Sequence, residues 1–195
     1  MRKTVLFVAI ANLAYFFVEY FVGRKIGSVS LFADSIDFLE DASVNLLILA
    51  ALGWSAKKRS AVGMALAALL LVPSVAALWT AWNKFFSPVA PDARLLSLVG
   101  SGALVINVSC AFLLAKYRKR GDSLSRAAFY SARNDALANI AIISAGIVTR
   151  RWVSGWPDLI VGIGIALLNA GAAKEVWDSA HREWKVNPPL RNVEQ

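Results

Sequence analysis

Six carboxylates lie within stretches of the sequence that are otherwise strongly apolar, and four of the six fall within eight consecutive residues. A charged side chain at the centre of a membrane costs about 2.5–3.5 kcal/mol on insertion scales, so this concentration indicates a use for the acids. Carboxylate oxygens bind divalent cations and can take up protons when the ion leaves. The six residues are Glu19, Asp34, Asp37, Glu40, Asp41 and Asp135.

The four clustered acids sort by helical geometry. Asp37 and Asp41 are one turn apart on one face, Asp34 and Asn45 extend the same polar stripe, and Glu40 points to another face. Two carboxylates this close repel each other, so at neutral pH they must share protons or hold a cation between them. The spacing therefore predicts a cation site on this helix.

A second polar stripe of one-turn spacing is formed by Ser131, Asp135 and Asn139. If this stripe faces the first, three carboxylates and several neutral oxygens surround one pocket, which suits a divalent cation.

Several polar residues near these stripes have two interpretations. Asp34 and Glu40 are as compatible with structural hydrogen bonds as with function. Asn12 and Glu19 lie two turns apart in the first apolar stretch, where they serve either interhelical contacts or a secondary path for cations or protons.

The chain that must position these residues has 195 residues, of which 57% are hydrophobic and 17% are charged, with a mean hydropathy of +0.55. Soluble domains carry about 25% charged residues, so this composition indicates a membrane protein. One cysteine and one histidine exclude an internal disulfide framework and a zinc site built from His and Cys.

Six apolar windows are long enough to cross a bilayer as helices, which requires about 20 residues each. We predict an all-α membrane protein, with one six-helix transmembrane domain over residues 1–178 and a short cytoplasmic tail over 179–195. The predicted spans are 4–23, 30–54, 61–86, 95–115, 126–149 and 157–177.

The distribution of positive charge predicts the orientation. The net charge is +8, and fourteen Lys and Arg residues fall on the side that holds both termini, against six on the other side. By the positive-inside rule both termini are cytoplasmic, in a multi-pass protein of the inner (cytoplasmic) membrane. The excess of positive charge is thus a topology signal, and we expect no nucleic-acid partner.

Four stretches resemble the cation diffusion facilitator family, whose members export zinc, cadmium, cobalt, manganese or iron in exchange for protons. The match at residues 27–41 is specific, and the others support it. The stretches are Asn12–Glu19, Gly27–Asp41, Ser131–Ala141 and Trp156–Gly162.

This resemblance implies a tetrahedral metal site formed by Asp37, Asp41, Ser131 and Asp135. Ser131 departs from the family pattern, because a hydroxyl is a weak neutral ligand where His or Asp is usual. The fourth position is then filled by water, Asn134, Asn139 or Asp34, or the metal preference shifts. Zn²⁺, Mn²⁺, Fe²⁺, Co²⁺ and Cd²⁺ all remain candidates for the transported ion.

The resemblance further implies a homodimer. It also implies a short form of the family, since the sequence ends about 18 residues after the last predicted span, without room for a cytoplasmic domain of about 80 to 100 residues. No prosthetic group is expected.

The function that follows is proton-coupled export of a divalent cation, without enzymatic activity. Two alternatives stay open. One is a proton-coupled exporter of organic cations, which the seven tryptophans could bind by stacking. The other is a non-transporting, metal-responsive membrane protein that lost turnover with its fourth ligand.

Overall fold

The computed structural model describes residues 2–50, 56–118 and 123–186, and within these ranges the chain forms helices and no strands. The prediction of an all-helical protein is thereby confirmed. The helices are α1 (Arg2–Ile26), α2 (Val29–Ala50), α3 (Ala56–Phe85), α4 (Ala93–Arg118), α5 (Ser123–Arg151) and α6 (Trp156–Val186).

Each predicted span coincides with one of these helices, with differences at the ends. Helix α6 continues to Val186, so the segment predicted as a tail begins as helix. The last part of the second predicted span, residues 51–54, lies outside the described residues.

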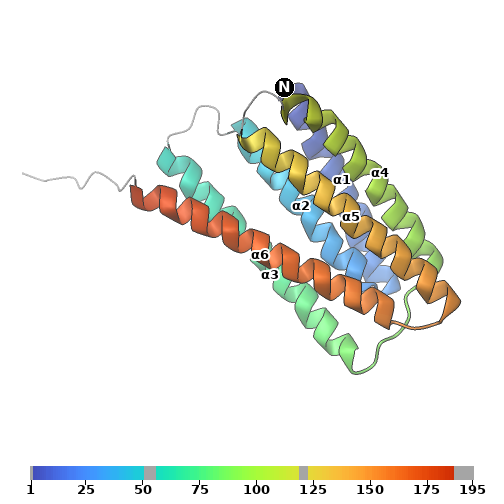
Figure 1. Cartoon of the computed structure of the whole chain (residues 1–195). Coiled ribbons are helices and arrows are strands. Elements are labelled where there is room, and N and C mark those ends of the chain that lie inside the picture. The colour runs from blue at the N-terminus through green and yellow to red at the C-terminus, as the bar shows by residue number, and fades with distance from the viewer. Residues whose placement is uncertain (1, 51–55, 119–122, 187–195) are drawn as a thin grey trace, which may run out of the picture.

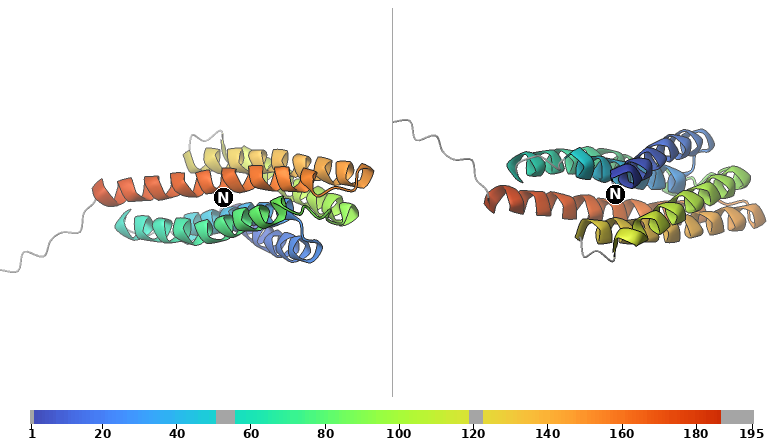
Figure 2. Two further views of the ribbon diagram at one scale, coloured as in Figure 1. Left: turned by 90° about the horizontal axis from the view of Figure 1, so that it is seen from below. Right: turned by 90° about the horizontal axis from the view of Figure 1, so that it is seen from above.

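Helix α2 is the central element of the fold, because it contacts each of the other five helices described. The most extensive packing joins α1 with α2, α4 with α5, and α3 with α6 (Figure 1). The α3–α6 pair runs alongside and extends past the other helices at the end where α6 terminates (Figure 2). The short connections α1–α2, α3–α4 and α5–α6 lie together at the opposite end (Figure 1).

The connection between α1 and α2 is a tight turn that α3 and α6 hold in place. Gly27 has a φ of 67°, a left-handed conformation that glycine adopts without strain, and Lys84 of α3 donates to its carbonyl. Ser28 then caps α2 by accepting a hydrogen bond from the Leu31 N–H at 3.1 Å.

The carboxylate of Asp158, in the first turn of α6, completes this cap. It accepts hydrogen bonds from the Ser28 and Ser30 hydroxyls, both at 2.6 Å, and from the Val29 N–H at 2.8 Å. A negative charge at a helix N-terminus satisfies unpaired N–H groups and the helix dipole together. Asp158 is only 2% exposed, so these hydrogen bonds are shielded from water.

The main hydrophobic core surrounds the first two turns of α2. It fixes the direction in which α2 leaves the turn, and therefore where its acidic residues lie. Its buried members are Leu31, Phe32, Ala33, Ile36, Ala77, Leu96, Val99, Ile142, Ile165 and Ala166.

The outside of the bundle is also strongly apolar. Phe112 is 80% exposed and Phe21 is 63% exposed, as is typical of helices that face lipid. Among the described residues, Arg2–Ile26 and Ala93–Leu114 are long and apolar enough to cross a membrane by length and composition.

Candidate functional site

A cavity of about 370 Å³ lies between α2, α5 and α6. Its polar side is formed by Asp37, Glu40 and Asp41 of α2 with Asn134 and Asp135 of α5. The remaining wall is largely apolar and comes from α5 and α6, including Ala138, Ile165 and Leu168.

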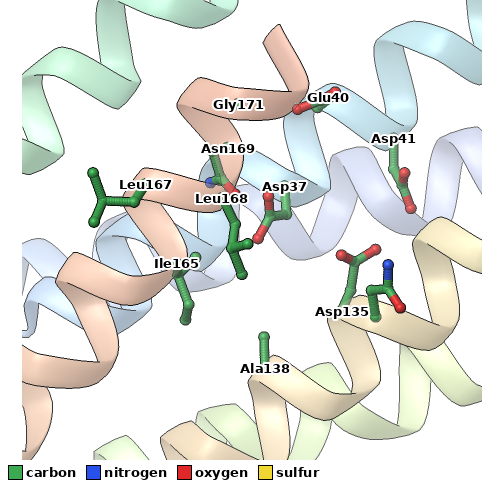
Figure 3. A pocket seen from close by; sticks show the side chains of 11 residues that line it. Asp37, Glu40, Asp41, Asp135, Ala138, Ile165, Leu167, Leu168, Asn169 and Gly171 are labelled. Atoms are coloured by element: carbon green, nitrogen blue, oxygen red, sulfur yellow. The ribbon is translucent and has the colours of Figure 1, made fainter. Parts of the chain in front are cut away.

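Helical periodicity places the three predicted carboxylates around this one space. Asp37 and Asp41 are one turn apart on α2, and Asp135 approaches from α5 (Figure 3). All three side chains are half-buried, so they face the cavity and are not sealed in the protein. The structure thus brings together residues that are about 100 positions apart in the sequence.

Two asparagine side chains, one from α1 and one from α2 itself, form hydrogen bonds with Asp41. The Asn12 amide of α1 donates to Asp41 Oδ2 at 3.4 Å, and the Asn45 amide donates to the Asp41 backbone carbonyl at 2.7 Å. The Cys110 thiol of α4 lies 3.9 Å from the Asn12 carbonyl oxygen. Asn12 therefore contacts the Asp41 carboxylate from behind, Asn45 contacts its backbone, and neither residue lines the cavity.

The carboxylates line the cavity, but they lie too far apart to bind one metal ion together. Among the described side chains, no group of three or more His, Cys, Asp or Glu residues is close enough to hold a metal ion. Such an open arrangement can admit a hydrated cation, but direct coordination by three residues requires their carboxylates to come closer together.

Two of the predicted auxiliary residues, Asp34 and Asn139, form a separate buried network with Asn107. Asn139 donates to Asp34 Oδ2 at 2.6 Å and accepts from the Asn107 amide at 2.9 Å. Asp34, Asn139 and Glu19 are fully buried and do not line the cavity.

Comparison with known proteins places this arrangement in a family. Residues 5–181 match the family of the cation efflux transmembrane domain. The chain belongs to the cation efflux family. Two relatives are named zinc transporter ZitB. The one from Yersinia pestis is 26% identical over 93% of this chain and 65% of its own length. The one from Yersinia pseudotuberculosis serotype I (strain IP32953) is 26% identical over 84% of this chain and 57% of its own length.

The match to the cation efflux domain confirms the family expected from residues 12–41, 131–141 and 156–162. The chain spans less than two thirds of the length of both relatives. The match extends over all six helices described, and so includes the three that line the cavity.

One residue implied by the family resemblance cannot be placed. Ser131 belongs to α5 one turn before Asp135, but its side chain lies outside the described ones. Its role as a weak ligand therefore stays a prediction. Asn134, a predicted substitute for it, is exposed and lines the cavity.

Two cavity residues were missed or misplaced by reasoning from the sequence. Glu40 was predicted to point away from the stripe, yet it lines the cavity beside Gly171 of α6 (Figure 3). Asn169 also lines the cavity, and its amide donates to the Ala33 carbonyl at 3.0 Å, which ties α6 to α2. An asparagine in an apolar stretch is the signal that could have identified it.

Proposed function

We propose that this cation efflux domain transports a divalent metal ion, with zinc as the first candidate, from the cytoplasm in exchange for protons. The observation that carries the proposal is the placement of Asp37, Asp41 and Asp135 around one cavity in an otherwise apolar bundle. Charges in such a place are costly unless they bind a cation or protons, and carboxylates do both.

The arrangement of the helices supports a six-span topology in the inner membrane with both termini in the cytoplasm. The three short connections lie at one end of the bundle, where Trp79, Trp82 and Trp152 are exposed (Figure 1). Exposed tryptophans are typical of the membrane–water interface. We assign this end to the outside, because it carries six of the Lys and Arg residues counted above, against fourteen at the other end.

The depth of the cavity along the helices is set by the residues that line it. Its lining comes from residues 37–41 of α2, 134–138 of α5 and 165–171 of α6. These segments lie near the middle of α2 and of α5 and in the first half of α6. This position supports a carrier site near the middle of the bilayer.

In the proposed mechanism the ion enters with the three carboxylates ionised, and α2 and α5 approach each other around it. Opening to the outside then exposes the carboxylates to protons, which neutralise them and release the ion. Protons move inward as the metal moves outward. The protein forms and breaks no covalent bond in its cargo.

Isothermal titration of the purified protein with Zn²⁺, Mn²⁺, Fe²⁺ and Co²⁺ tests the site. We expect Asp135→Asn to weaken binding by about tenfold or more, because it removes one of three charged ligands. Ser131→His should raise the affinity for Zn²⁺ relative to Mn²⁺, because imidazole suits zinc better. Equal binding by the unaltered protein and Asp135→Asn would contradict the site.

A further inference from the structure

A second pair of carboxyl groups lies between α1 and α2, apart from the metal cavity. Glu19 of α1 and Asp34 of α2 are both fully buried, with exposed fractions of 0%. Neither lines the cavity of Asp37, Asp41 and Asp135. Two acids sealed in an apolar interior require a positive charge or a proton to offset their own.

The hydrogen bonds around the pair are incomplete. Asp34 Oδ2 accepts from Asn139, but no donor among the described groups reaches Asp34 Oδ1 or either oxygen of Glu19. Helices α1 and α2 pair Asn12 with Asp41, Tyr15 with Phe38 and Gly23 with Leu31. This antiparallel register places Glu19 level with Asp34, so the two buried carboxyl groups face each other. Two carboxyl groups can form a hydrogen bond only when one of them carries a proton.

The surroundings favour a proton over a metal ion. Ca²⁺ or Mg²⁺ takes about six or more oxygen ligands and Zn²⁺ takes about four. Here no third His, Cys, Asp or Glu joins the pair among the described residues. The Asn139 amide is engaged at both ends, by Asp34 and Asn107, and the Tyr15 hydroxyl donates to the Val99 carbonyl at 2.7 Å.

Few other ionisable groups face the pair. They are Tyr15 on α1 and Asp37 on α2. Helices α4 and α5 present the neutral amides of Asn107 and Asn139. Helices α3 and α6 approach this part of α2 with Ala77 and with the Asn169 amide, which donates to Ala33.

We propose that Glu19 and Asp34 bind one proton between them, and that this proton is one of those exchanged for the metal. The exchange role rests on the proposed function. Asp37 lies about one turn from Asp34 on α2, so its negative charge favours the protonated form of the pair. A divalent cation at Asp37 offsets that charge and favours transfer of the proton from the carboxyl oxygen to solvent as H⁺. Because linkage is reciprocal, the bound proton in turn weakens metal binding.

Two nearly isosteric variants remove the shared proton while keeping a hydrogen bond between the two side chains. In Glu19→Gln an amide N–H can donate to Asp34 and replaces the shared proton permanently, and Asp34→Asn does the same from the other side. Both variants should therefore fold. Tyr15→Phe is the matched control, because it removes a neighbouring hydroxyl but no carboxyl group.

Infrared spectroscopy of the metal-free protein detects the proton directly. We expect a carbonyl stretch of a protonated carboxylic acid that is lost in Glu19→Gln and in Asp34→Asn and is retained in Tyr15→Phe. A spectrum without this band, or a band that both variants retain, would overturn the proton site whatever the metal data show.

Calorimetric titration with Zn²⁺ in buffers of different ionisation enthalpy counts the protons released on metal binding. We expect Glu19→Gln to bind Zn²⁺ and to release about one proton fewer than the unaltered protein. Equal release would overturn the exchange role while leaving the proposed function intact. Failure of the unaltered protein to bind any of the four metals would contradict the proposed function, and the exchange role with it.

Discussion

At the scale of single residues, the metal cavity depends on side chains that hold its carboxylates as well as on the carboxylates themselves. Asn12 is fully buried, lies on α1 and reaches Asp41 on α2. Spacing along one helix predicted the Asp37–Asp41 pair, because both residues belong to the same stripe. Spacing alone could not show whether Asn12 is itself a ligand or a residue that positions one, since that depends on how α1 packs against α2.

Replacing Asn12 by alanine tests this positioning role. The amide donor to Asp41 is lost, so the carboxylate is less well oriented, and we expect metal affinity to fall by about tenfold. Isothermal titration measures the change. Ser144→Ala is a suitable control, because the Ser144 hydroxyl is exposed and bonds only within its own helix, to the Ile140 carbonyl. Unchanged affinity in Asn12→Ala would contradict the role.

At the scale of helices, the position of α2 is set by its contact with the start of α6. Gly162 of α6 permits this approach, because a Cβ atom there would lie 2.7 Å from the Ser30 nitrogen and from Val29 atoms. Gly164, two residues further, has no atom within 4 Å of such a Cβ. The two glycines therefore differ in their packing, although they lie only two residues apart on α6.

This contrast predicts opposite effects of the same substitution. Gly162→Ala should destabilise the fold by about 1–3 kcal/mol, because backbone and side-chain atoms of α2 must move. Gly164→Ala should be neutral or stabilising by up to about 1 kcal/mol, from helix propensity alone. Thermal unfolding in detergent compares the two. If both variants melted alike, close packing of α6 on α2 at Gly162 would not contribute to stability.

The sequence predicted the helices better than their contacts. Apolar windows located all six described helices to within a few residues at most ends, because length and hydropathy are local properties. The contact between Asp158 and the start of α2 joins residues about 130 positions apart and has no local signature. Glu40 was misplaced for a similar reason: helical phase showed that it leaves the stripe, but not that α6 closes the cavity on that side.

At the scale of the whole molecule, one bundle combines an apolar outside with a charged interior. Exposed aromatic and aliphatic side chains cover α1 and α4, while Asp37, Asp41 and Asp135 lie inward. This is the reverse of a soluble protein and suits a domain that carries a cation across lipid. Homodimer formation stays a prediction.

Transport by the protein reconstituted in lipid vesicles that contain a metal-sensitive dye tests the central claim most directly. With a proton gradient opposed to metal movement, we expect Zn²⁺ uptake by the unaltered protein and its loss in Asp41→Ala and Asp135→Ala. Asp92→Asn is the control, since Asp92 lies in the α3–α4 connection, where asparagine also caps α4. Uptake by either alanine variant at the rate of the unaltered protein, or metal binding without flux, would contradict the account.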